Sequence, residues 1–290
     1  MSLNLMYITN IPDVAYIAEQ NGVDRIFVDM EYIGKALRQK GENSLINKHT
    51  IEDVRAVRAA VRKAELLVRV NPIHNAGVDY PSSEEEIESV IEAGADVVML
   101  PWFKTIDEIR RFLLAVDGRA RTNLLLETKE AADLLDDILL IDGIDEIHIG
   151  LKDLAMSMGR SFMFELLTDG TVEALCRKMN AAGMYYGFGG IAAPGHGLVS
   201  AEMIIREHYR LESRMVILSR AFCNIKETGY DLETVKSVFE HDVPAIRALE
   251  KECRYYLEMK GTEHTGYFFS NQQKLKEAVC RTVDTIHPGK

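Results

Sequence analysis

The sequence predicts an α/β fold, a (β/α)8 TIM barrel with a C-terminal helical extension. Short apolar runs typical of buried strands alternate with amphipathic segments typical of helices as far as about residue 222. There are eight such runs, and the stretch that holds them approaches the ~250 residues usual for this barrel. The alternative is a doubly wound open sheet, but no GxGxxG motif follows the first apolar run and no Walker A sequence occurs. We therefore expect the closed barrel.

The expected elements follow one another at regular spacing. The predicted strands are Leu5–Ile8, Arg25–Asp29, Leu66–Val70, Asp96–Leu100, Asn123–Leu126, Glu146–Ile149, Tyr185–Phe188 and Met215–Leu218. Capping pairs mark three helix starts, namely Thr50 with Asp53, Ser83 with Glu86 and Thr105 with Glu108. Glycines precede several strands and are expected to end helices, as at Gly22, Gly94 and Gly183.

Beyond Phe222 the alternation stops and the chain has helical spacing. We expect helices over Asp231–Glu240, Val243–Met259 and Ser270–Thr285. Residues 1–225 would then form the barrel domain and residues 226–290 a helical extension. Helices outside a complete barrel need a partner surface, so we expect them to serve oligomerisation, with covering of the barrel floor as the alternative.

Composition limits the kinds of partner. The chain has 290 residues, a net charge of −11 and a pI of about 5.3. No basic run offsets this acidic balance, so we expect a small-molecule partner and neither nucleic acid nor a membrane. The four cysteines are widely separated and without metal-ligand spacing, which favours a reduced, cytoplasmic protein. The N-terminus lacks a signal-peptide pattern, and no apolar run approaches the ~20 residues that cross a bilayer.

Residues 123–159 contain two strand-like runs that each end in a carboxylate. Glu127 follows the first run and Asp153 follows the second, and Lys129 to Ile141 between them has helical periodicity. A strand–helix–strand unit crosses over to a parallel strand, so both acids are expected at one edge of the sheet. Two carboxylates there suit Mg²⁺ or Mn²⁺. The alternative is that both acids merely cap helices or turns.

Other strand ends add an arginine and more acids. Arg69 ends an apolar run, where a cation is expensive to bury unless it faces an anion, and its planar guanidinium suits a carboxylate. A structural ion pair with Asp29 or Glu31 is the alternative, and both can hold at once. Trp102, after Pro101 at the fourth strand end, is expected to line the pocket or to pack against a neighbouring subunit.

Five segments carry a family resemblance. They are FVDMEY, LLVRVNP, EAGADVVMLP, LLLETKEA and IDEIHIGLKDLAMSMG, and their order and spacing resemble the HpcH/HpaI aldolase family. This family is related to citrate lyase β-subunits and to the pyruvate/phosphoenolpyruvate barrel superfamily. The similarity covers most of the chain, from about residue 10 to about residue 222.

The resemblance implies a metal-dependent class II aldolase, a carbon–carbon lyase. Such an enzyme cleaves or forms a C–C bond between pyruvate or a similar 2-keto acid and an aldehyde through a metal-stabilised enolate. It implies Glu127 and Asp153 as ligands of Mg²⁺ or Mn²⁺, and Arg69 as the group that binds the keto acid and stabilises the enolate oxygen. The backbone of Gly150 and Leu151 would hold the carboxylate. Family members form dimers or hexamers, so the resemblance also implies a homo-oligomer.

Two positions depart from the family pattern. Tyr32 stands where the family usually has a histidine assigned to acid–base work, and a tyrosine with an ordinary pKa near 10 is a poor base at neutral pH. Tyrosine can still donate a proton, so Tyr32 is kept with Arg69 as a catalytic candidate. Asp29 and Glu31 match the rest of that motif and are also counted as catalytic candidates, as groups that support the site or bind water. Leu151 stands where proline is common.

The departure at Tyr32 keeps further functions open. A barrel that binds a keto acid without turnover is one alternative, and an oxaloacetate decarboxylase or another lyase of the same superfamily is the other. Three histidines could replace the missing one: His196 and His74 on loops near strand ends, and His148 within a strand, where a structural role is more common.

Overall fold

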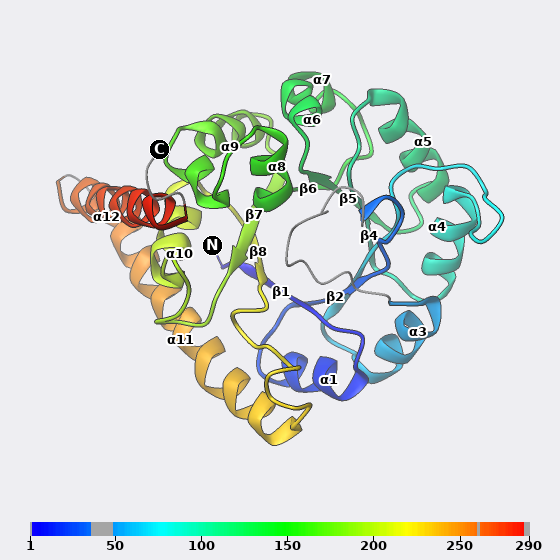
Figure 1. Ribbon diagram of the computed structural model, residues 1–290, viewed down its shortest axis with the longest axis horizontal. Helices are drawn as coiled ribbons and strands as arrows, with labels where there is room; N and C mark the ends of the chain where they lie inside the picture. Colours follow the sequence, from blue (N-terminus) through cyan, green and yellow to red (C-terminus); the bar gives the residue numbers. More distant parts are fainter. Residues whose placement is uncertain (1, 36–48, 260–261, 287–290) are drawn as a thin grey trace. The chain divides into compact units, whose positions relative to one another are not determined.

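The computed structural model describes residues 2–35, 49–259 and 262–286. Its strands form a closed barrel in chain order, β1-β2-β3-β4-β5-β6-β7-β8, with helices outside the strands (Figure 1). Every strand pair whose register is described is parallel. The TIM-barrel prediction is therefore confirmed. The strands are β1 Asn4–Ile8, β2 Arg25–Asp29, β3 Glu65–Arg69, β4 Val97–Leu100, β5 Arg121–Leu126, β6 Glu146–Ile149, β7 Tyr185–Ile191 and β8 Met215–Leu218.

The chain divides into two compact units, which we describe separately. One comprises Met6–His148 and the other Met1–Leu5 with Ile149–Lys290. The division into residues 1–225 and 226–290 stays a prediction.

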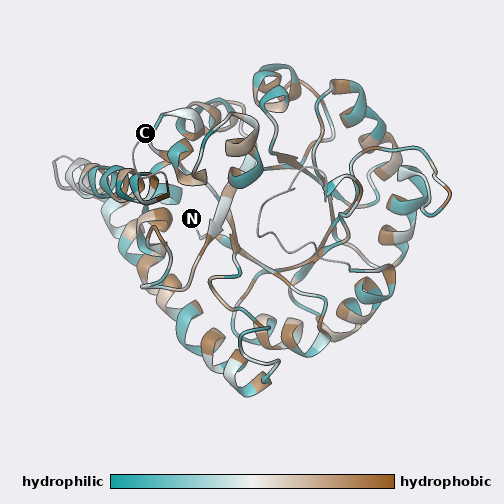
Figure 2. Cartoon of the chain, viewed as in Figure 1, coloured by the Kyte–Doolittle hydropathy of each residue, from teal (hydrophilic) through white to brown (hydrophobic). Residues whose placement is uncertain are grey.

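The unit Met6–His148 is built around β2 to β5, whose residues are almost all buried. Its helices are α1 Pro12–Gln20, α3 Ile51–Ala60, α4 Ser83–Glu92, α5 Ile106–Val116, α6 Lys129–Asp133 and α7 Leu135–Ile138. Consecutive helices of the α1, α3, α4, α5 series pack against each other. These helices carry hydrophobic and hydrophilic residues on opposite faces (Figure 2), so one face is available to cover the strands.

Capping side chains explain where the helices of this unit begin. Thr50 with Asp53 and Thr105 with Glu108 form reciprocal capping boxes, as predicted. The prediction for α4 was wrong by one residue, because the box is formed by Ser82 and Glu85. Ser83 instead accepts a hydrogen bond from the backbone of the preceding loop and is buried.

Two predicted helix boundaries were also wrong. The segment from Lys129 to Ile141 forms two short helices, α6 and α7, because the chain leaves helical geometry at Leu134. The predicted break before Val243 is absent: α11 runs from Leu232 to Glu258 through Pro244. Val243 and Ile246 are buried on either side of the proline, and this packing opposes the ~3 kcal/mol or more by which an internal proline disfavours a helix.

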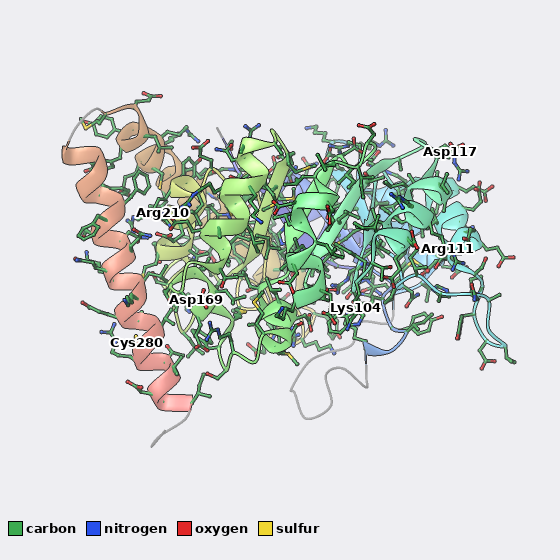
Figure 3. All side chains as sticks on the ribbon, turned by 90° about the horizontal axis from the view of Figure 1, so that it is seen from above. Lys104, Arg111, Asp117, Asp169, Arg210 and Cys280 are labelled. Carbon is green, nitrogen blue, oxygen red and sulfur yellow. The ribbon has the colours of Figure 1, made fainter. Side chains whose placement is uncertain are left out.

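The other unit contains β7, β8 and the C-terminal helices. Its helical elements are α8 Leu151–Ser157, η1 Met163–Leu167, α9 Thr171–Ala181, α10 Ala201–Arg210, α11 Leu232–Glu258 and α12 Thr262–Ile286. Helix α12 starts earlier than the predicted Ser270. Arg210, labelled in Figure 3, pairs with Glu207 and Glu173, while α10 packs against both α11 and α12. The N-terminal segment joins this unit, since Leu3 donates its backbone N–H to Glu250 at 2.6 Å.

Close strand packing explains one glycine of β7. A Cβ at Gly187 would stand 2.1 Å from the backbone oxygen of Met215 in β8, so no other residue fits without moving the strands apart. Within the described ranges, no helix is long and apolar enough to cross a membrane.

Candidate active site

The ends of β2 and β3 hold a buried ion pair. Asp29 and Arg69 are the last residues of these strands and stand opposite each other in the parallel register. The Nε and Nη2 groups of Arg69 donate to the two carboxylate oxygens of Asp29, each at 2.8 Å. The side chains are 1% and 13% exposed. The structural ion pair of Arg69 with Asp29, which the sequence analysis named as one alternative, is therefore present.

Two more charges complete this cluster. Lys35 Nζ lies 3.1 Å from a carboxylate oxygen of Asp29 and 3.1 Å from one of Glu31. Glu31 also lies 3.4 Å from Arg69 Nε. The four side chains thus balance two negative charges with two positive ones. Lys35 was missed by the sequence reasoning, and its only signal was a spacing of four residues from Glu31.

Arg69 keeps its positive charge in this cluster. Burial by itself would lower its pKa, but the charges of Asp29 and Glu31, with a smaller effect of Glu127, hold the pKa above its ordinary value. Its Nη1 group donates to no residue that the structure describes. The guanidinium carbon lies 5.4 Å from the ring centroid of Phe27. Asp29 therefore occupies the edge of the guanidinium that Nε and Nη2 form.

Tyr32 is fixed through its backbone. Asn71 Oδ1 accepts the backbone N–H groups of Tyr32 and Ile33, each at 2.9 Å, and Asn71 Nδ2 donates to Glu86 at 2.7 Å. The Tyr32 side chain is 45% exposed. Partial burial and the charge of Glu86 raise the pKa of its hydroxyl, which makes Tyr32 a still weaker base near neutral pH.

A histidine that the sequence reasoning missed contacts the same strand end. His49 Nδ1 accepts the backbone N–H of Asp29 at 3.0 Å. Burial lowers the pKa of the imidazole, against the opposing charge of Asp29. No local pattern marks His49, because twenty positions separate it from Asp29 in the chain.

Glu127 is held at the ends of β4 and β5. It is 3% exposed, and its Oε1 accepts the backbone N–H of Trp102 at 2.9 Å. Trp102 has a φ of 52°, a left-handed conformation that is strained for a bulky residue and that occurs preferentially at functional sites. Glu127 does not cap the following helix, because Thr128 is the N-cap of α6. Pro101 is buried next to Trp102, and Lys104 Nζ lies 5.5 Å from the indole centroid.

Gly150, Leu151 and Asp153 belong to the unit that begins at Ile149. Gly150 is the N-cap of α8, Leu151 is the first helical residue and is buried, and Asp153 lies half-buried in the first turn. Gly189 has a φ of 56°, and a Cβ there would stand 2.6 Å from a methyl group of Leu151. The start of α8 is therefore packed tightly against β7.

The two predicted metal ligands carry the donor type that a hard divalent cation prefers. Glu127 and Asp153 offer carboxylate oxygens, the ligand type of Mg²⁺ and Mn²⁺, and Mg²⁺ sites usually use one or two protein carboxylates. Among residues 2–35, 49–259 and 262–286, no group of three or more His, Cys, Asp or Glu side chains is arranged to hold a metal.

The three histidines named from the sequence lie in different settings. His74 has Nδ1 2.7 Å from the carbonyl oxygen of Pro72 and Nε2 2.9 Å from that of Pro81, so its ring is used within the β3–α4 loop. His148 is buried in β6, and His196 is exposed in the other unit.

Comparison with known proteins gives consistent matches. A sequence model of the HpcH/HpaI aldolase/citrate lyase family matches residues 5–182. The chain is 26% identical to a hydroxypyruvate/pyruvate aldolase of Roseovarius nubinhibens, over 44% of this chain and 61% of that protein. It is 28% identical to one of Sagittula stellata, over 31% of this chain and 48% of that protein. The chain thus spans less than two thirds of the length of these curated relatives.

The solved structures show a similar fold. An HpcH/HpaI aldolase from Desulfitobacterium hafniense DCB-2 superposes with a TM-score of 0.58 at 16% identity, over 81% of this chain and 93% of that one. At this identity the likeness concerns the fold alone.

Proposed function

Because the chain belongs to the HpcH/HpaI aldolase/citrate lyase family, we propose that it is a divalent-metal-dependent class II aldolase. It forms or cleaves a C–C bond between pyruvate or a similar 2-keto acid and an aldehyde. The observation that carries the proposal is Arg69, a permanently charged guanidinium at the end of β3 whose Nη1 donates to no described residue.

Arg69 binds the keto acid and stabilises the enolate. Asp29 fixes the guanidinium by two hydrogen bonds, so little orientational freedom is lost when an anion binds to Nη1. A positive charge held in place beforehand stabilises the negative charge that develops on the keto oxygen when the adjacent C–C bond breaks. Lys35 and Glu31 keep the cluster electrically balanced.

Glu127 and Asp153 are the proposed metal ligands. Bound Mg²⁺ or Mn²⁺ supplies Lewis-acid stabilisation of the enolate. The proximity of Trp102 N–H to Glu127 supports the first assignment, since the hydrogen bond fixes one carboxylate oxygen. The assignment of Asp153 rests on the family pattern. The backbone of Gly150 and Leu151 holds the substrate carboxylate, and Pro101 and Trp102 line the substrate site.

Tyr32 favours one competing function. Its raised pKa makes Tyr32 a poor replacement for the family's histidine. The loss of this acid–base group is what we expect of a barrel that binds a keto acid without turnover. The two functions differ in a single measurable step, the removal of a proton from the methyl group of the bound keto acid.

Deuterium exchange into the methyl group of pyruvate, followed by NMR, tests the proposal without knowledge of the aldehyde. We expect wild type to exchange in the presence of Mg²⁺ or Mn²⁺ and to lose this activity when EDTA is added. The exchange rate should fall at least about hundredfold in Arg69→Ala and Glu127→Gln. Arg110→Ala and Glu240→Gln are matched controls, because they change exposed members of surface ion pairs, and both should exchange like wild type. Metal-dependent pyruvate binding without exchange would establish the binding barrel instead.

We further propose that the protein is a homo-oligomer, a dimer to hexamer, assembled through α11 and α12. Tyr255 on α11 and Phe269 on α12 are more than half exposed, which supports a covered surface. Light scattering after size exclusion should give at least twice the mass of 32.7 kDa, and a monomer would contradict it.

A further inference from the structure

His49 does not belong to β2, but its side chain contacts Asp29, the last residue of that strand. It directly precedes Thr50, the N-cap of α3, and its Nδ1 accepts the backbone N–H of Asp29 at 3.0 Å. A backbone N–H can only donate, so Nδ1 must present its lone pair. The neutral ring therefore carries its proton on Nε2.

This hydrogen bond acts on the residue that orients Arg69. The carboxylate of Asp29 accepts two hydrogen bonds from Arg69 and one from Lys35, while the amide of the same residue is held by His49. Beyond Asp29 the backbone is still tied to β3, because Met30 donates its N–H to the carbonyl oxygen of Arg69 at 3.0 Å. The imidazole adds a hydrogen bond to the amide of Asp29 itself, the residue whose carboxylate orients Arg69.

The surroundings of His49 keep the ring neutral. The charged groups that act on it are Asp29 of β2, Lys35 of the following turn, Asp53 of α3 and Arg69 of β3. Two are negative and two positive, so their effects largely oppose one another. Burial then decides the direction and lowers the pKa of His49.

We propose that His49 is a positioning residue of the active site, whose neutral imidazole holds the end of β2 so that Asp29 presents Arg69 to the 2-keto acid. The inference rests on the proposed function for the role of Arg69. Protonation of Nδ1 would place an N–H against the amide of Asp29, and two donors cannot share a hydrogen bond. The hold is therefore released when the ring is protonated.

This arrangement predicts that exchange activity is lost at low pH, when His49 becomes protonated. The pKa of His49 in the folded protein lies below the ordinary value near 6.5, so the ring is neutral at pH 7 and the hold is complete there. As the pH falls through the folded-state pKa, pyruvate-dependent exchange should decline about tenfold per pH unit. The decline should appear in the KM for pyruvate, because Arg69 binds the substrate.

His49→Asn separates the hold from the titration. The amide oxygen of asparagine can accept the Asp29 N–H in place of Nδ1, but it does not titrate. This variant should keep exchange within about threefold of wild type at pH 7.5 and lose the acid decline. His49→Ala lacks an acceptor and should raise the KM for pyruvate about tenfold or more at every pH. His241→Asn, on the exposed part of α11, is the matched control and should keep the wild-type profile.

NMR provides readouts that do not depend on turnover. With ¹⁵N-labelled histidine, His49 should be the neutral Nε2–H tautomer at pH 7. The Asp29 amide and Arg69 Nε–H resonances should follow the titration of His49 in wild type and not in His49→Asn. If these shifts occur while no variant shows exchange, the aldolase function fails and the positioning role stands. An unchanged acid limb in His49→Asn, or an Nδ1–H tautomer, would overturn the inference.

Discussion

Replacing Asp29 by asparagine tests how Arg69 is held. Asp29 and Glu31 balance Lys35 and Arg69, so Asp29→Asn leaves one uncompensated positive charge among these four groups. The side chains involved are 1% to 13% exposed. The new amide NH₂ must also face donor groups of Arg69 or Lys35, since the amide offers only one acceptor oxygen.

The magnitude follows from this burial. Removing one partner of a buried pair costs about 3–5 kcal/mol, because the remaining charge stays in a poorly solvated place. For a chain of this size that corresponds to a fall in Tm of roughly 6 to 20 °C. The affinity for pyruvate should fall at least about tenfold, since Arg69 is no longer fixed in direction.

Thermal unfolding by circular dichroism and pyruvate titration by calorimetry measure the two effects. Asp133→Asn is the matched control, because Asp133 pairs with Lys129 on the surface of α6 and both side chains are more than half exposed. Its loss should change stability by less than about 1 kcal/mol. If Asp29→Asn melts like this control and binds pyruvate like wild type, Asp29 does not hold Arg69.

Three further variants test other parts of the structure. Trp102→Gly should melt above Trp102→Ala by roughly 2 to 4 °C, because the φ of 52° costs a residue with a Cβ about 1 kcal/mol; equal Tm values would remove the argument for strain. Burial alone would raise the pKa of Glu146, but the hydrogen bonds that it accepts from Arg25 hold this pKa below its ordinary value. The ionised carboxylate therefore stabilises the fold fully above about pH 4.5, and this stabilisation is lost as the pH falls through the folded-state pKa. Glu146→Gln should therefore unfold at lower temperature at pH 7 and show a flatter loss of Tm in acid, and an unchanged acid slope would contradict this. Gly189→Ala should lower the free energy of unfolding by about 1–2 kcal/mol and weaken pyruvate binding, because the methyl group of the alanine displaces Leu151 at the start of α8. If calorimetry finds wild-type affinity for pyruvate, the packing of Leu151 does not affect the substrate site.

Local pattern was sufficient for most of the barrel. The strands Arg25–Asp29, Glu146–Ile149 and Met215–Leu218 have the predicted bounds, because short apolar runs between polar turns determine a buried strand within a few residues. Arg69 and Glu127 were found for the same reason, since a charged residue directly after such a run must lie at a strand end. Their chemical roles remain proposals.

Only the tertiary structure decided which groups meet. Lys35 and His49 both contact Asp29 in the folded protein, and neither belongs to a periodic pattern. The register of β2 and β3 sets Asp29 opposite Arg69, which residue order alone does not specify. Likewise α11 continues through Pro244 because buried neighbours outweigh a local preference. Sequence determines what each segment can form by itself, whereas packing over many residues determines which side chains are held together.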